Sequence, residues 1–190
     1  MKQKSILYLD KPGRSGNSAC VLAAAQRAAS LGLAHAVVAT TTGRTALDLA
    51  LALRKCASRA KVVGVGYAAD FAARWGRLDP GLVKRAEELG VTFITGGHAF
   101  GGVNSAIQSK FGGLSPNKIV AQTYYTMGQG FKVAVEVALM AADQHRLPQG
   151  REVLALGGTG KGADTALVLT PACSGGFFDL RIHEIVCKPR

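Results

Sequence analysis

The sequence predicts an α/β protein with a three-layer α/β/α architecture around a mixed, mostly parallel sheet. Short Val- and Ala-rich runs of strand length alternate with Ala- and Leu-rich segments of helical period. Hydrophobic residues make up 48% of the chain but aromatic residues only 6%, a composition that suits close packing of helices on a sheet. The last two strand-like segments are close enough to pair antiparallel, which makes the expected sheet mixed.

In the first half of the chain, expected strands alternate with expected helices. Strands are expected at 5–9, 36–39 and 61–66. Asp10, Pro12 and Gly13 close the first strand, and Ser15 or Asn17 can cap a helix that ends at Gly32. A second helix is expected at 45–53, where Ala and Leu recur at helical spacing.

In the second half, residues 67–78 have a weak pattern, which indicates a loop or short helical turn over the ligand side of the sheet. Asp79 and Pro80 suit the cap and first turn of a helix that ends at Gly90. The remaining strands are expected at 91–95, 151–156, 166–169 and 178–186, and the remaining helices at 103–111, 115–127 and 131–145. With 190 residues and no linker or repeat, the whole chain, 1–190, is expected to form one domain.

Two segments have the character of phosphate-binding loops. The first joins two expected strands and contains four glycines, one cation and one carboxylate, namely Gly157, Gly158, Thr159, Gly160, Lys161, Gly162 and Asp164. Glycine lets bare backbone amides approach an anion closely. The second is the strand-to-helix turn made of Thr40, Thr41, Thr42, Gly43, Arg44 and Thr45.

A third glycine-rich strand exit, 96–102, contains Gly97 and His98. Ligands of open α/β sheets bind beyond the carboxyl ends of the strands, so the three exits should converge there. The helix that follows Gly43 offers unpaired amides and a partial positive charge. Four or five charge-assisted hydrogen bonds of about 1.5–3 kcal/mol each would hold a phosphate monoester at about micromolar affinity, and Arg44 or Lys161 would strengthen it.

The formal net charge of +11 raises the question of nucleic-acid binding, but the Lys and Arg residues are scattered singly along the chain. Most of this charge is therefore expected on a solvated surface. The four cysteines form no CxxC motif and are expected to be buried free thiols, which indicates a reducing compartment, the cytoplasm. No apolar run approaches the length that spans a membrane.

Several motifs together resemble the stand-alone pyruvate kinase α/β domain proteins of archaea and bacteria, and through them the C-terminal domain of pyruvate kinase. The motifs are KPG, VVATTTGRTA, GGHAFGGV, KFGG, MGQGFKVAVEVALMAAD, GGTGKGADTALVL and FFDLRIHEIVCKPR, which together cover nearly all of the chain. The resemblance implies a pyruvate kinase C-terminal domain-like fold and bound flavin mononucleotide (FMN). It does not imply kinase activity, because that chemistry belongs to a (β/α)₈ barrel for which this chain has no room.

On this resemblance the phosphate of FMN is expected on the Thr40–Thr45 turn and its ring under the Gly157–Asp164 loop. Gln129 and Lys132 lie where Gly128 and Gly130 interrupt a helix, a place where an amide can reach the flavin edge. Gly97 stands where related proteins commonly have threonine, so a hydroxyl contact is lost there. Any redox activity would come from the flavin, and self-association into a homo-oligomer is expected.

Each of these residues also has a purely structural interpretation. The threonines can cap a helix and the glycines can form a hairpin turn. Asp164 can either bind a ligand hydroxyl or flavin N–H, or hold its own loop by accepting backbone amides. His98 can be a proton donor beside a flavin or a structural residue. Two other functions also stay open, namely a sugar-phosphate or nucleotide sensor without catalysis and a basic nucleic-acid-binding domain.

Overall fold

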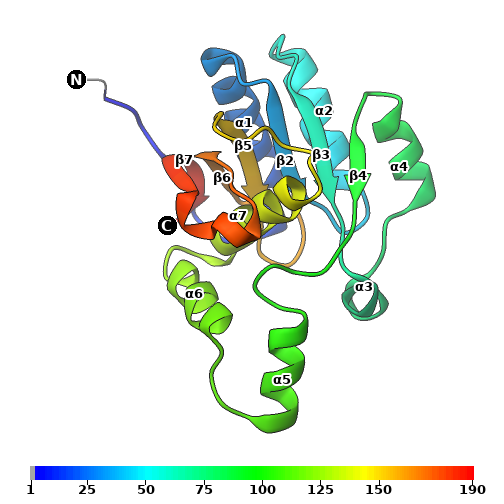
Figure 1. Ribbon diagram of the computed structural model, residues 1–190. Helices are drawn as coiled ribbons and strands as arrows, with labels where there is room; N and C mark the ends of the chain where they lie inside the picture. The colour runs from blue at the N-terminus through cyan, green and yellow to red at the C-terminus, as the bar shows by residue number, and fades with distance from the viewer. Residues whose placement is uncertain (1–2) are drawn as a thin grey trace.

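The computed structural model describes residues 3–190 and contains a seven-stranded sheet in the order β1-β7-β6-β5-β2-β3-β4 (Figure 1). The strands are β1 (Leu7–Leu9), β2 (His35–Ala39), β3 (Lys61–Val65), β4 (Thr92–Ile94), β5 (Val153–Gly157), β6 (Thr165–Thr170) and β7 (Arg181–Pro189). All pairings are parallel except those of β6, which runs antiparallel to β5 and β7. The mixed, mostly parallel sheet predicted from the sequence is confirmed.

Helices cover both faces of this sheet and complete the three layers. They are α1 (Asn17–Leu31), α2 (Arg44–Lys55), α3 (Ala69–Trp75), α4 (Pro80–Glu87), α5 (Val103–Phe111), α6 (Pro116–Tyr125) and α7 (Gln129–Asp143), with the 3₁₀ turns η1 (Arg14–Gly16) and η2 (Ser174–Asp179). Helices α1, α2 and α4 pack in one apolar cluster and α6 and α7 in another. Strand residues alternate between the two: Val38 belongs to the first cluster and Val37 to the second.

Local signals fix several helix ends where the sequence predicted them. The Asp79 side chain accepts a hydrogen bond from the Leu82 amide at 2.8 Å and caps α4, with Pro80 in its first turn. Ser115 caps α6 in the same way through the Lys118 amide. Helix α1 ends at Gly32, whose φ of 63° is the left-handed conformation that glycine adopts most easily.

Other boundaries differ from the prediction for reasons of tertiary contact. The last strand, expected from residue 178, begins at Arg181, because residues 174–179 form η2. Ser174 donates through its amide and hydroxyl to Asp143 at the end of α7, at 2.7 and 2.6 Å, which holds this segment in a turn. Residues 67–78 contain the short helix α3.

Two further observations concern membrane spans and the cysteines. Among the helices of residues 3–190, none combines the length and apolar character needed to cross a membrane. The four cysteines carry free thiols, but only Cys20 and Cys187 are buried, whereas Cys56 and Cys173 are partly exposed. The expectation that all four are buried was therefore wrong for two of them, because Cys56 lies just beyond the end of α2 and Cys173 just before η2.

Candidate functional site

The carboxyl ends of six parallel strands lie at one edge of the sheet, and the candidate loops leave from this edge. Strands β2 and β5 are direct neighbours, so the Thr40–Thr45 turn and the Gly157–Asp164 hairpin leave the sheet side by side. The third glycine-rich exit follows β4, which lies beyond β3 in the strand order. The strand order thus brings the first two loops together, whereas β3 separates the third loop from them.

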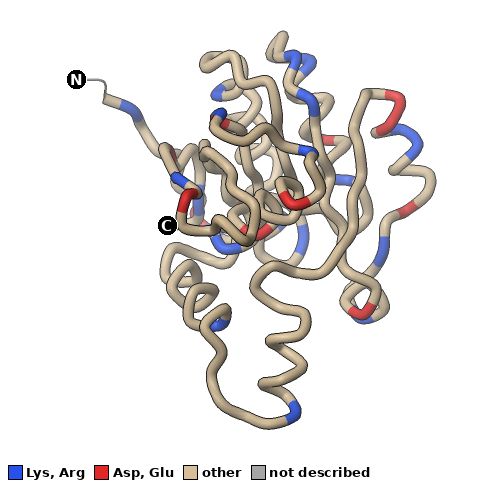
Figure 2. The backbone as a smooth tube through the Cα atoms, in the orientation of Figure 1, with Lys and Arg blue, Asp and Glu red and all other residues tan. Residues whose placement is uncertain are grey.

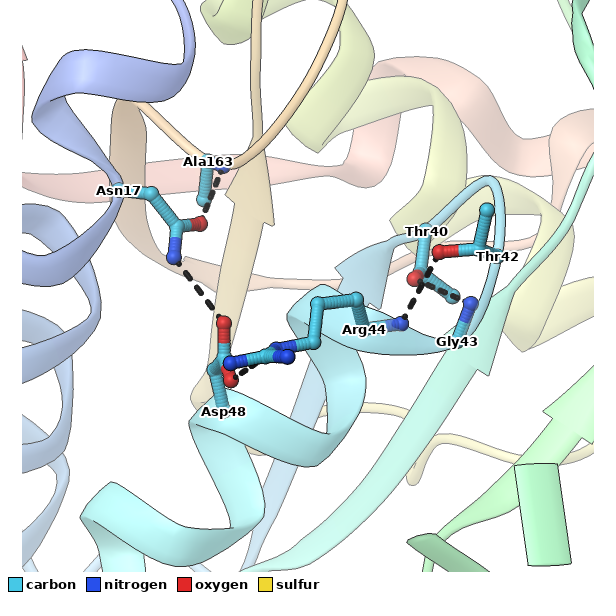
Figure 3. A network of polar contacts seen from close by, with 7 residues as sticks. All are labelled: Asn17, Thr40, Thr42, Gly43, Arg44, Asp48 and Ala163. Atoms are coloured by element: carbon cyan, nitrogen blue, oxygen red, sulfur yellow. Dashed lines mark hydrogen bonds and ion pairs between the residues drawn. The ribbon is translucent and has the colours of Figure 1, made fainter. Parts of the chain in front are cut away.

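The threonine turn is organised by its own hydroxyl groups. The Thr40 hydroxyl accepts the Gly43 amide at 3.0 Å, and the Thr42 hydroxyl accepts the Arg44 amide at 3.4 Å (Figure 3). Gly43, at φ 96°, takes the N-cap position of α2 and has no side chain to cap the helix. Within residues 3–190 the amides of Thr45 and Ala46 therefore meet no hydrogen-bond acceptor.

The side chains of this turn differ in how accessible they are. Thr40 and Thr45 are buried, Thr41 is half-buried, and Thr42 and Arg44 are exposed. One side of the turn rests on the segment before α4, since the Asp79 amide donates to the Thr42 carbonyl at 3.0 Å. The exposed Thr42 and Arg44 mark the part of the turn that a ligand can reach.

Asn17 and Asp48 join the threonine turn to the hairpin. The Asn17 side chain accepts the Ala163 amide at 2.8 Å and donates to Asp48 at 3.2 Å. Asp48 in turn accepts from the Arg44 guanidinium at 2.8 Å. Figure 3 shows these groups as one chain of polar contacts that runs from the hairpin through the start of α1 to the first turns of α2.

Packing accounts for two of the four hairpin glycines. A Cβ on Gly157 would lie 2.1 Å from the Gly130 carbonyl oxygen, and one on Gly158 would lie 1.9 Å from the Gly162 carbonyl oxygen. Gly160 and Gly162 instead have positive φ, 74° and 78°. Close packing against neighbouring backbone atoms explains why the first two positions are glycine, and left-handed backbone conformation explains the other two. No ligand is needed to account for any of the four.

The outer side of the hairpin remains accessible. Gly160 and Lys161 are exposed and Thr159 is half-buried. The Gly160 amide donates to no acceptor within the described part of the chain, and Lys161 has no acidic partner there. This tip offers an anion one amide and one ammonium group.

Asp164 holds its own loop. It is fully buried, and one carboxylate oxygen accepts the amides of Gly13 and Thr159 at 2.8 and 3.0 Å. The other oxygen accepts the Thr165 hydroxyl at 2.9 Å. Both oxygens are thus used inside the protein, which is the structural role that the sequence left open for this residue. The same contact ties the KPG turn at Gly13 to the hairpin.

The space beneath the hairpin is filled by the start of α7. A Cβ on Gly130 would lie 2.2 Å from an Asp164 carboxylate oxygen and 2.3 Å from the Thr165 hydroxyl. Between the start of α7 and Asp164 there is thus no room for a flavin ring, because α7 packs directly on the strand there. Gln129, the residue before Gly130, is exposed at the first position of α7 and stands beside the hairpin.

His98 belongs to a different cluster, on the α7 face of the sheet. Its Nδ1 atom lies 3.7 Å from a carboxylate oxygen of Glu136, and its ring stacks on Tyr67 and lies tilted against Phe71. Glu136 also accepts the Phe100 amide at 2.9 Å and a hydrogen bond from Lys132 at 2.5 Å. The cluster anchors the 96–102 loop to α7, while Gly97 is exposed beside open space.

Burial acts to raise the pKa of Glu136, but its hydrogen bonds and charged neighbours outweigh this effect. The nearby His98 ring, the charge and hydrogen bond of Lys132 and the hydrogen bond from the Phe100 amide together hold the pKa below the usual value of a glutamate. Glu136 is therefore ionised at neutral pH although it is only 4% exposed.

Asn17, Asp48 and Glu136 were missed as site residues. Asn17 was considered only as a helix cap, and Asp48 was not singled out. Glu136 had one detectable signal, since it is the only acid inside the apolar helix segment 131–142 and lies four residues after Lys132.

Two hollows lie at the opposite edge of the sheet. One is lined by residues after β6, among them Thr170 and Cys173, and the other by residues before β3, among them Ser58 and Lys61. Neither contains a candidate site residue. The candidate site, formed by two loops at the carboxyl edge of the sheet, is therefore separate from both hollows.

A comparison of the sequence with models of known protein families found none that matches. The fold and the site therefore define the chain only as an α/β protein with two adjoining strand-exit loops at the carboxyl edge of its sheet.

Proposed function

We propose that the protein binds a phosphate monoester, with FMN as the preferred ligand, between the Thr40–Thr45 turn and the tip of the Gly157–Asp164 hairpin. The observation that carries the proposal is the pairing of β2 with β5, which places an uncapped helix N-terminus beside an exposed glycine-rich tip. Amides of a helix N-terminus favour an anion through both hydrogen bonding and the helix dipole.

The residues present fit the phosphate of such a ligand. Thr45 and Gly160 supply amides with no internal acceptor, the Thr42 hydroxyl is exposed, and Lys161 supplies a cation. Asp164 is excluded from ligand contact and serves to shape the hairpin. The ring of FMN would lie outside the hairpin, on the side of Gln129, since the underside is filled.

The choice of FMN over other phosphate monoesters rests on the resemblance to the pyruvate kinase α/β domain proteins. FMN would supply one- or two-electron redox chemistry when bound. The role of this chain would be to hold and position it. The resemblance also favours the cytoplasm. A sugar phosphate or nucleotide is the second candidate, because the same amides and cation would bind its phosphate.

Binding to nucleic acid is less well supported. Figure 2 shows Lys and Arg distributed over many separate elements rather than gathered along one strip of the molecule. Nucleic-acid sites usually form such a basic strip.

The test is a titration of purified protein with FMN, followed by flavin fluorescence and by thermal shift, against a panel of sugar phosphates and nucleotides. We expect a dissociation constant of about micromolar size for the preferred ligand and a rise in melting temperature only with ligands that bind the folded state. Thr42→Glu puts a carboxylate beside the phosphate position and should abolish uptake with the fold intact. Thr42→Ser is the matched control. Full binding by Thr42→Glu, or no response to any phosphate monoester, would contradict the proposal.

A further inference from the structure

Helices α5 and α6 form an arm that reaches away from the three layers (Figure 1). We call helices α5 and α6 and the turn between them the α5–α6 arm. Its large apolar side chains are exposed to an unusual degree: Val103 is 75%, Ile107 49%, Phe111 76%, Leu114 64% and Ile119 52% exposed. Contiguous apolar surface of this kind marks an interaction site in a folded protein.

Helix α5 turns its apolar side outward. Val103, Ile107 and Phe111 are spaced four residues apart and share one face, and all three are exposed. The two least exposed residues of the helix are polar, Asn104 and Gln108. An amphipathic helix normally packs its apolar face against the protein and exposes its polar face. Helix α5 does the reverse and exposes its apolar face.

The arm also lacks the support that a short helix needs. Helix α5 has nine residues and no buried residue, and an isolated helix of that length is marginal in water. In contrast, α6 packs on α7 and contributes the buried Ala121. A contact that covers the outer face of α5 would supply the missing stabilisation.

The charge of the arm selects the kind of partner. Between Glu88 and Glu136 the sequence has no acidic residue, and the arm carries only Lys110 and Lys118. Surface helices that bind anionic membranes usually carry clusters of four to eight basic residues. An apolar surface nearly free of charge is instead typical of the core of a protein–protein interface.

The area is sufficient for a dimer. At about 150 Å² for each whole side chain, the lower end of the range for aromatic residues, the five arm residues and the neighbouring Tyr125 and Met127, 37% and 38% exposed, expose roughly 600 Å². Stable interfaces bury about 600–1,000 Å² on each partner. From these observations we infer that the protein forms a two-fold symmetric homodimer through its α5–α6 arms, each covering the apolar face of the other. This inference does not depend on the phosphate site.

The experiment is sedimentation velocity of the full chain over a range of concentrations, with Phe111→Glu as the disrupting variant. We expect a dimer for the wild type and an increase of at least about 30-fold in the dissociation constant for the variant. The matched control is Phe178→Glu, which changes an aromatic residue that is 84% exposed on η2, outside the arm, and should leave the dimer intact. Circular dichroism checks that both variants fold.

Salt distinguishes a second copy from an anionic partner. Because each copy carries a formal net charge of +11, raising the salt concentration from about 0.05 to 0.5 M should strengthen self-association by screening repulsion. Hydrogen exchange of the α5 amides should slow as protein concentration rises. A monomeric wild type, a dimer unaffected by Phe111→Glu, or a monomer that binds anionic vesicles through Phe111 would each overturn the inference.

Discussion

Gly157 at the end of β5 lies against Gly130 in the first turn of α7, so closely that no side chain fits between them. A Cβ on Gly157 would come within 2.1 Å of the Gly130 carbonyl oxygen and 2.5 Å of the Ala134 amide nitrogen. Both neighbours are backbone atoms and cannot rotate away. This contact lets α7 begin directly beside the hairpin and sets the position of Gln129.

We expect Gly157→Ala to destabilise the fold by more than about 3 kcal/mol, because the helix must move off the strand to admit one methyl group. Thermal or urea unfolding measures the loss. Gly97→Ala is the matched control, since Gly97 has open space around it and no positive φ, and it should change stability by less than about 0.5 kcal/mol. Equal stability of the two variants would show that α7 does not contact β5 as described.

The sequence predicted the elements that depend on local signals. Asp79 and Ser115 cap their helices and Gly32 ends α1, because a cap involves residues only a few positions apart. The pairing of the last two strands was also predicted correctly, from their closeness in the sequence. The two phosphate-type loops adjoin because β2 pairs with β5. The positions of strand ends in the sequence do not determine this pairing.

The contacts that join the site could not be predicted, because they depend on the strand order. Asn17 meets Ala163, 146 positions further along the chain, only because β1 pairs with β7 and α1 then crosses back toward β2. Burial of Asp164 likewise depends on Gly13 arriving from the other end of the chain. Sequence patterns indicate where loops occur, but not which distant side chain accepts hydrogen bonds from the backbone amides of each loop.

The link through Asn17 can be tested by removing it. In Asn17→Ala the Ala163 amide loses its acceptor and Asp48 loses a donor, which should cost about 1–2 kcal/mol of stability. Hydrogen exchange at Ala163 should accelerate, and affinity for FMN should fall because the hairpin is no longer held to α2. Asn117→Ala is a suitable control: it removes one hydrogen bond to the Ala99 carbonyl and should leave exchange at Ala163 unchanged.

Glu136 predicts a specific dependence of stability on pH. Its pKa in the folded protein is lowered, so its stabilising effect is present above the usual glutamate pKa of about 4.3 and is lost as the pH falls through the folded-state value. Glu136→Gln should cost about 3 kcal/mol at neutral pH, since it leaves Lys132 buried without its counter-charge. The difference from wild type should shrink below about pH 4.

Unfolding free energies of wild type and Glu136→Gln at several pH values test this expectation. Glu152→Gln, at an exposed position, serves as the control and should follow the wild-type profile. A difference between wild type and Glu136→Gln that stays constant from neutral to acid pH would mean that the charge of Glu136 is not what stabilises the 96–102 loop.

Lys161 and Arg44 should contribute unequally to phosphate binding. Arg44 is held by Asp48 at 2.8 Å, whereas Lys161 at the exposed hairpin tip has no acidic partner within residues 3–190. We therefore expect Lys161→Ala to weaken FMN binding about 10-fold, which corresponds to about 1.4 kcal/mol, and to reduce its dependence on salt. Arg44→Ala should have a smaller effect, because binding through Arg44 first requires its ion pair to break. As a control, the melting temperature of Lys161→Ala without ligand should match that of the wild type. A larger loss of affinity in Arg44→Ala than in Lys161→Ala would contradict this expectation and place the phosphate nearer to α2 than to the hairpin.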